Sequence, residues 1–301
     1  MSGTGRGAIL DLDEEVEKGQ QPAGAVVVGV DGSDKDRRAL HWAAEEAAAT
    51  GVGLHVLYCV PVVPERLGLT LAVDVEELGA TITAHARGRA LARHPDLTVT
   101  TETVVEDPAV ALVLASHRAA AVVVGARGLG RIAGRLLGSV SQKVAAYAHG
   151  VVVVVRETPA IDGPVVVGVD PLDTDERTLE FAFAQADRRD VPVRLVHARA
   201  HRGRVDPRVE PALTAAAEQQ AAALAELVDT WSARHPDVPV DVREVSQHPV
   251  DALTAESADA SLVVVGSRGR SGLTGVRLGS VARGVLHEAR VVAVVHVGPA
   301  S

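Results

Sequence analysis

Two glycine-rich stretches carry the residue types and spacing that could bind an anion. Each follows a short apolar run, has the pattern G-x-x-G-x9-G-S, and stands directly before a segment of helical character. Glycine lets the backbone approach a ligand closely, and the first N–H groups of a helix have no partner within the helix. A strand, loop and helix start of this kind typically binds phosphate. The two stretches are residues 122–139 and 262–280.

Either loop alone could be an ordinary turn, but repetition of the same spacing in the same context favours a functional role. The arginines in both loops could neutralise phosphate through charge-assisted hydrogen bonds, or they could be solvated loop charges. The sequence leaves both interpretations open. These arginines are Arg127, Arg131, Arg135, Arg268, Arg270 and Arg277.

The segments that must position the loops occur twice in the same order, as a first and a second copy. Short valine-rich runs alternate with segments whose apolar residues recur at helical spacing. In the first copy we expect strands at residues 25–30, 53–60, 97–105, 121–124 and 151–155, and helices at 36–50, 75–93, 108–117 and 139–149. In the second copy we expect strands at 164–170, 192–198, 239–245, 262–265 and 291–297, and helices at 173–189, 208–234, 249–257 and 281–288.

This alternation predicts an α/β fold in which each copy is a doubly wound, five-stranded parallel sheet. The length of 301 residues and the hydrophobic content of 47% are sufficient for two such cores in tandem. Ligands of doubly wound sheets bind outside the carboxyl ends of the strands, where both glycine loops are expected. The predicted organisation is a flexible tail at residues 1–23, a first domain at 24–157, a linker at 158–163 and a second domain at 164–298.

An aspartate at the end of the first strand of each copy is the second candidate for ligand binding. Asp31 and Asp170 both follow a V-G-V run. Aspartate also commonly caps helices and stabilises turns, and the two roles are compatible.

The V-G-V-D ending of the first strand and the G-x-x-G-x9-G-[ST] loop after the fourth resemble those of tandem universal stress proteins. The resemblance covers residues 25–297 and implies an adenine-nucleotide alpha-hydrolase-like, Rossmann-like fold. For nucleotide-binding members, the resemblance implies that the aspartate faces adenine and that a hydrophobic residue at the end of the second strand holds the ring. It also implies that the glycine loop lines the ribose and the phosphates. With Arg127 and Arg268, the predicted nucleotide-binding residues are Asp31, Val60, Gly125, Gly128, Gly138 and Ser139 in the first copy, and Asp170, Ala198, Gly266, Gly269, Gly279 and Ser280 in the second.

The two copies differ directly after the aspartate. The first copy has Gly32 and Ser33 there, whereas the second has Pro171 and Leu172. The change removes a hydroxyl and an N–H group beside the predicted pocket. The prediction of nucleotide binding is therefore weaker for the second copy, although its glycine loop is complete.

The resemblance implies an ATP-binding regulator whose nucleotide occupancy alters partner contacts or conformation during stress or slow growth. Two alternatives remain open. One is a slow ATPase or phosphotransferase using Mg²⁺ held by phosphate oxygens and a nearby aspartate; the other is an interaction module whose loops are vestigial or bind another adenylate such as cyclic AMP. The chain has no G-x4-G-K-[ST] motif, and no residue presents itself as a general base beside the loops. We therefore assign no catalytic residue and favour binding over catalysis.

Composition argues against several other partners. The formal charge of −9 and the six aromatic residues provide neither a basic field nor stacking platforms for nucleic acid. No uninterrupted apolar run approaches the roughly 20 residues that a membrane-spanning helix needs. A single cysteine and the absence of an apolar leader predict a cytoplasmic location.

Three further features receive structural interpretations. His197 and His201 are four residues apart, but the spacing crosses a strand end where the side chains do not converge, so no metal site is predicted. Cys59 is most simply a small apolar residue, with redox sensing as the alternative. The fifth strands, 151–155 and 291–297, are unbroken apolar runs at expected sheet edges, and exposed edges invite pairing. We expect the copies to pack there as a pseudo-twofold dimer; association of two chains and the identity of a protein partner stay open.

Overall fold

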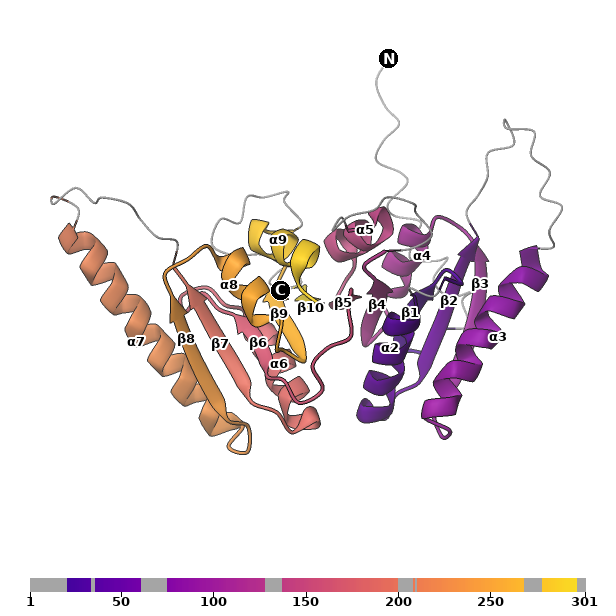
Figure 1. Cartoon of the computed structure of the whole chain (residues 1–301), viewed down its shortest axis with the longest axis horizontal. Helices are drawn as coiled ribbons and strands as arrows, with labels where there is room; N and C mark the ends of the chain where they lie inside the picture. Colours follow the sequence, from indigo (N-terminus) through magenta and orange to yellow (C-terminus); the bar gives the residue numbers. More distant parts are fainter. Residues whose placement is uncertain are drawn as a thin grey trace, which may run out of the picture. The chain divides into compact units, whose positions relative to one another are not determined.

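The computed structural model describes residues 21–33, 36–60, 75–127, 137–199, 208, 210–267 and 278–296. Contacts divide the chain into two compact units, residues 1–124 and 125–301. Strands and helices alternate along both units, as Figure 1 shows.

The first unit contains a parallel sheet in the order β3-β2-β1-β4. Its valine-rich central strands are almost fully buried, because helices must cover both faces of a parallel sheet. Its elements are β1 (Val26–Val30), α2 (Asp36–Thr50), β2 (Leu54–Val60), α3 (Val75–Arg93), β3 (Val99–Val105), α4 (Pro108–Ala115) and β4 (Ala121–Gly125).

The second unit contains five parallel strands in the order β10-β9-β6-β7-β8. Two further elements of the first copy, α5 (Ser139–Tyr147) and β5 (Val151–Val155), belong to this unit. The remaining elements are β6 (Val165–Gly168), α6 (Glu176–Arg189), β7 (Val193–Ala198), α7 (Glu210–Arg234), β8 (Val240–Val245), α8 (Pro249–Glu256), β9 (Leu262–Gly266), α9 (Ser280–Glu288) and β10 (Val291–Val295).

The strand order fixes which helices share a face of the second sheet. Strands β6, β7 and β8 follow one another outward, and the chain then returns to β9 on the other side of β6. Because parallel crossovers are right-handed, α6 and α7 cover one face, and α8 and α9 cover the other. Contacts between α8 and α9 agree with this placement.

The predicted pairing of the fifth strands is observed. β5 and β10 form an antiparallel ladder that runs from Val291 opposite Val155 to Val295 opposite Val151. Both strands are thereby paired on that side, which removes an exposed apolar edge. The predicted packing of the two copies as a pseudo-twofold dimer stays a prediction.

The tandem α/β fold class is confirmed, and the expected elements agree with the structure to within three residues at each described end. The helices at 36–50 and 75–93 have the predicted bounds. The start of α6 was predicted three residues too early. Residues 170–173 form a turn, in which Asp173 N donates to Asp170 O over 2.9 Å, and Asp175 then caps the helix by accepting from Arg177 N over 2.8 Å.

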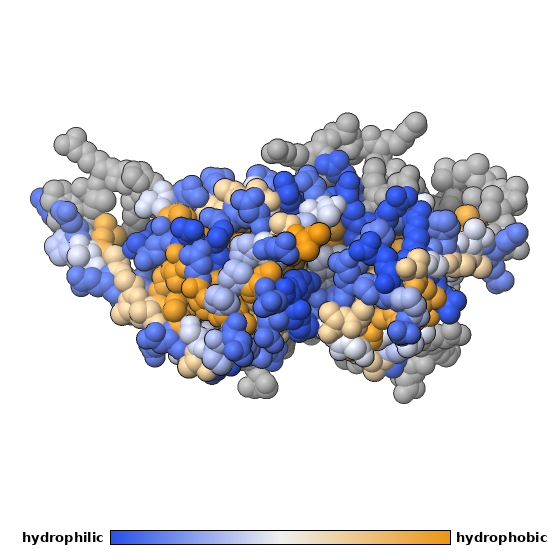
Figure 2. Space-filling model, turned by 60° about the horizontal axis from the view of Figure 1, so that its bottom comes forward, coloured by the Kyte–Doolittle hydropathy of each residue, from blue (hydrophilic) through white to orange (hydrophobic). Residues whose placement is uncertain are grey.

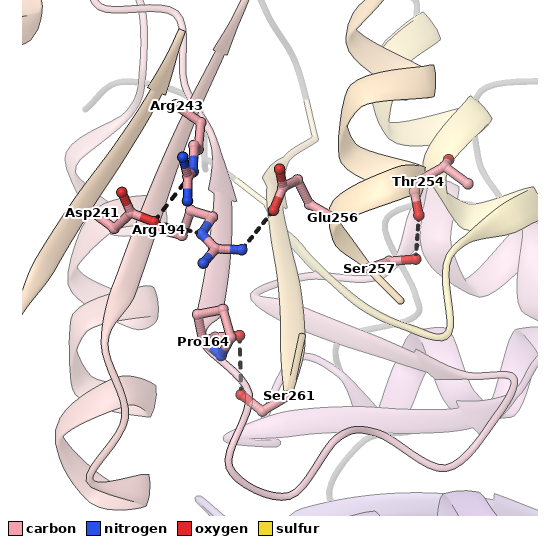
Figure 3. Close-up of polar contacts among 8 residues, drawn as sticks. All are labelled: Pro164, Arg194, Asp241, Arg243, Thr254, Glu256, Ser257 and Ser261. Atoms are coloured by element: carbon pink, nitrogen blue, oxygen red, sulfur yellow. Dashed lines mark hydrogen bonds and ion pairs between the residues drawn. The ribbon is translucent and has the colours of Figure 1, made fainter. Parts of the chain in front are cut away.

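An ion-pair cluster holds α8 against the outer strands of the second sheet (Figure 3). The Arg194 guanidinium, on β7, donates from Nε to Asp241 Oδ2 on β8 over 2.8 Å and from Nη1 to Glu256 Oε2 on α8 over 2.7 Å. Arg243 contacts the same Asp241 oxygen at 3.4 Å. Arg194 is the second residue of β7, and the ligand-binding end is expected at the other end of the strand, so this cluster anchors the end of α8 that lies away from the site.

Hydrophobic patches lie between hydrophilic residues on the face of the molecule shown in Figure 2. Among the described residues, the large hydrophobic side chains with the greatest exposure are Ile161 at 83% and Val105 at 64%. No helix in the described ranges is both long enough and apolar enough to cross a membrane.

Candidate functional site

A cavity of about 320 Å³ opens at the carboxyl end of the second unit's parallel sheet. The ends of β6, β7 and β9 and the beginnings of α6, α8 and α9 line it. This is the end at which doubly wound sheets bind ligands, because the strand order reverses there. Five residues predicted from the sequence line this one cavity: Asp170, Ala198, Gly266, Gly279 and Ser280.

The N-terminus of α9 supplies the cavity with hydrogen-bond donors. Gly279 occupies the N-cap with φ −64° and ψ 160°, and as a glycine it has no side chain with which to cap the helix. The first intrahelical bond of this turn runs from Arg283 N to Gly279 O over 3.0 Å. The N–H groups of the first three helical residues therefore precede the internal ladder, and these residues, 280–282, line the cavity. Such a helix start attracts an anion through its free N–H groups and its dipole.

Asp170 forms a tight turn at the edge of the cavity. Its Oδ1 accepts a hydrogen bond from Leu172 N over 3.2 Å. Thr174 Oγ1 accepts from Asp170 N and donates to Asp170 O, both over 2.8 Å. Asp31 accepts from Ser33 N over 3.0 Å in the same way. The turn-forming interpretation of both aspartates is therefore correct, and ligand contact stays a prediction that is compatible with it.

The glycine loop of the first copy has the same local geometry where it is described. Gly138 caps α5 with φ −68° and ψ 152° and without a capping side chain, and Gly138 N donates to Ala126 O over 2.8 Å. In the second copy Gly279 N donates to Ser267 O over the same distance. Ser139 begins α5 as Ser280 begins α9.

The predicted residues of the first copy are divided between the two units. Asp31 and Val60 lie in the first unit, whereas Gly125, Arg127, Gly138 and Ser139 lie in the second. The structure therefore describes an assembled cavity for the second copy. Gly128, Arg268 and Gly269 lie outside the described residues.

Comparison with known proteins gives two matches, one for each copy of the repeated sequence pattern. Residues 23–156 and residues 163–296 each match the universal stress protein family. The chain belongs to the universal stress protein family.

Tandem members of this family resemble the chain along nearly its whole length. Universal stress protein Rv2005c of Mycobacterium tuberculosis is 39% identical over 285 residues, which cover 90% of this chain and 96% of that protein. A universal stress protein of Mycolicibacterium smegmatis is 36% identical over 279 residues, which cover 88% and 94% of the two chains. The crystal structure of a universal stress protein from Archaeoglobus fulgidus has a TM-score of 0.66 at 20% identity, covers 91% of this chain and 97% of that chain, and shows the shared fold.

In this universal stress protein the second copy has Pro171 where the first has Gly32, and the turn at the aspartate is kept. In the first copy Gly32 has a positive φ of 77°, and its N–H donates to Asp36 Oδ2 over 3.0 Å. The N–H group that proline removes is therefore bonded inside the protein in the first copy. In the second copy Thr174 takes over part of this task by binding the Asp170 backbone. The lost N–H group is thus no loss to a ligand, whereas Leu172 still lacks the hydroxyl of Ser33, so weaker nucleotide binding by the second copy stays a prediction.

Strand register refines the comparison between the two copies. Gly29 pairs with Leu57 in β1 and β2, and Gly168 pairs with Val196 in β6 and β7. Since Gly29 and Gly168 precede the two aspartates by the same number of residues, Ala198 corresponds in register to Cys59 and not to Val60. Cys59 and Val60 are both buried.

The Cys59 thiol has the properties of a core residue. Burial, together with the negative charges of Asp107, Glu102 and Glu106, raises its pKa to about 12. The thiol therefore stays protonated at neutral pH, which argues against the redox-sensing alternative.

His197 and Thr178 are cavity-lining residues that the sequence interpretation missed. Both are buried, with 4% and 1% of their surface exposed. His197 Nδ1 lies 3.2 Å from Val169 O, whereas His197 Nε2 and Thr178 Oγ1 are buried and have no hydrogen-bond partner among the described residues. Among the described residues, no group of three His, Cys, Asp or Glu side chains is arranged to hold a metal ion. These two residues differ from other histidines and threonines only in how deeply their side chains are buried. The spacing of residues in the sequence does not show this burial.

Proposed function

We propose that this universal stress protein is an ATP-binding regulator and that the cavity of its second copy is a nucleotide site. The observation that carries the proposal is the uncapped start of α9, which lines the same cavity as the Asp170 turn. The helix start offers N–H donors to phosphate oxygens, and the strand ends between it and Asp170 offer a mostly apolar wall to a base.

The apolar wall comes from four structural elements. Val169 and Ala198 follow or end strands, Leu253 comes from α8, and Val265 comes from β9. Small-molecule sites usually combine such a wall with a few polar groups that fix orientation. The volume of about 320 Å³ lies near the lower end of the range for ligand pockets. One arrangement of the nucleotide matches the groups at both ends of the cavity. In it, adenine and ribose lie beside Asp170, and the phosphates lie at the glycine loop.

Regulation would follow from binding and not from turnover. A bound nucleotide can shift a conformational equilibrium only by the difference between its affinities for the two states. A protein partner that recognises one of these states would then report nucleotide occupancy. Mg²⁺ would accompany ATP, held by the phosphate oxygens, and would offset part of their negative charge at the glycine loop.

Mass spectrometry of small molecules released by denaturing the purified full-length protein tests the proposal. We expect ATP to be recovered at about one or two molecules per chain. Cyclic AMP in its place would identify another adenylate as the ligand. No recovered nucleotide, and no thermal stabilisation when ATP or cyclic AMP is added, would contradict the proposal and favour an interaction module.

A phosphate-release assay separates the regulator from an enzyme. The same preparation should release no phosphate from ATP over many molar equivalents. Multiple turnover that is lost in both Asp31→Ala and Asp170→Ala would instead support a slow ATPase or phosphotransferase.

A further inference from the structure

His197 Nε2, which has no hydrogen-bond partner in the part of the chain that the structure describes, is the most informative polar atom of the cavity. His197 stands one residue before the end of β7, lines the cavity and is almost fully buried. A buried polar atom without a partner costs about as much free energy as a lost hydrogen bond, so native structures rarely keep one unless a ligand or an enclosed water completes it.

The hydrogen bond at the other ring nitrogen decides what His197 can offer. Nδ1 lies 3.2 Å from Val169 O, and a carbonyl oxygen can only accept. Nδ1 must therefore carry the proton of the neutral ring, which leaves Nε2 as an acceptor. The complementary ligand group is a hydrogen-bond donor.

Strand register places His197 on the α6 face of the sheet. A Cβ atom added at Gly168 would contact Leu253 on α8, so Gly168 faces α8. Val196 is the register partner of Gly168 and shares this face, and the next residue, His197, points to the opposite face. Thr178 lies on α6 and is also buried with an unpartnered Oγ1. Two unsatisfied polar atoms therefore belong to the same face beside the cavity.

The first copy lacks both groups. By register, Tyr58 corresponds to His197, and Ala39 corresponds to Thr178 at the same separation from the aspartate. A donor-specific contact is therefore expected in the second copy and not in the first.

We propose that His197 is a specificity-determining residue of the second-copy site, where its Nε2 accepts a hydrogen bond from the exocyclic amino group of an adenine base. The inference rests on the proposed function, because it names the ligand group that the nucleotide cavity selects. Purine nucleotides without this amino group leave Nε2 unpaired and bind more weakly.

The test compares two nucleotides that differ only in that group. Calorimetric titration of the full-length protein with ATP and with purine riboside 5′-triphosphate measures the affinity ratio at each site. At one site the wild-type protein should bind ATP about tenfold or more tightly than it binds purine riboside 5′-triphosphate, because the analogue leaves a buried acceptor without a hydrogen bond. In His197→Phe this ratio should fall to within about twofold of one. The matched first-copy variant, Tyr58→Phe, should keep the wild-type ratio.

A second measurement does not depend on whether His197→Phe folds. In wild-type protein labelled with ¹⁵N at histidine, ATP should shift the His197 Nε2 resonance in the direction of an accepted hydrogen bond, and the analogue should not. Equal affinities for the two nucleotides, or a preference that survives in a folded His197→Phe, would overturn the role of His197 and assign Nε2 to an enclosed water. Failure of the wild-type protein to bind either nucleotide would instead overturn the proposed function and the inference with it.

Discussion

Replacing Gly168 by alanine should destabilise the protein and narrow the nucleotide cavity. Gly168 ends β6 and lines the cavity opposite the α8 side chain Leu253. A Cβ atom added at Gly168 would lie 2.8 Å from Leu253 Cδ1 and 3.4 Å from its Cδ2. Optimal carbon–carbon contacts are about 3.5–4.0 Å, so the new methyl group overlaps Leu253 by nearly 1 Å.

The magnitude follows from the confinement of Leu253. Leu253 is 2% exposed and lines the cavity, so it can relieve the overlap only by moving into the cavity or by straining the core around it. Overpacking of this kind costs about 1–3 kcal/mol, while replacing glycine in a strand returns about 0.4–1 kcal/mol by restricting the unfolded chain. The net loss should be about 1–2 kcal/mol, which corresponds to a fall in Tm of roughly 2–8 °C for a domain of this size.

Thermal unfolding and ATP titration of Gly168→Ala measure both effects. The matched control is Gly88→Ala in α3, where an added Cβ meets nothing within 4 Å. That variant should be more stable than wild type by about 0.5–1 kcal/mol, because alanine favours a helix over glycine. Its affinity for ATP should be unchanged, whereas Gly168→Ala should bind ATP more weakly. A Gly168→Ala protein at least as stable as wild type would refute the close packing of β6 against α8.

Three further predictions follow from individual residues. Phe183 is fully buried, and its ring centroid lies 5.1 Å from those of both Trp231 and His235. Phe183→Ala should therefore lower the free energy of unfolding, measured in urea, by about 3–5 kcal/mol, and a loss under about 1 kcal/mol would contradict this packing. Cys59, with its pKa raised to about 12, should react with iodoacetamide at pH 8 roughly 10³-fold more slowly than free cysteine, and rapid labelling of the folded protein would contradict its burial. Burial raises the pKa of the Asp36 carboxyl above that of an aspartate in the unfolded chain, so the wild-type protein loses folding stability as the pH rises and this carboxyl ionises. The stability of Asp36→Asn relative to wild type should therefore increase between pH 3 and pH 7. A constant difference would disagree with the buried environment of Asp36.

Much of the fold follows from local sequence patterns. Helices α2 and α3 have the predicted bounds because their apolar spacing and their flanking turns both lie within a short segment. Helix α4 likewise begins as expected, since Asp107 caps it by accepting from Ala109 N over 2.9 Å and Pro108 occupies its first turn. The uncapped starts of α5 and α9 could be predicted because the repeated Gly-Ser pairs mark them.

The polar details of the site depend on contacts between distant segments. Whether Cys59 or Val60 corresponds to Ala198 is decided by strand register, which a continuous apolar run does not specify. The replacement of the Gly32 turn by Pro171 and Thr174 could not be predicted, because a threonine at that spacing does not show that it binds the Asp170 backbone. The spacing of His197 from His201 says nothing of the cavity, because the burial of Nε2 depends on how distant segments pack around β7.

A crystal structure of the full-length protein with ATP tests the central claim most directly. We predict adenine in the second-copy cavity beside Asp170 and His197, with phosphate oxygens accepting hydrogen bonds from the N–H groups at the start of α9. ATP bound away from this cavity, or a cavity that stays empty at an ATP concentration that saturates binding in solution, would contradict the account.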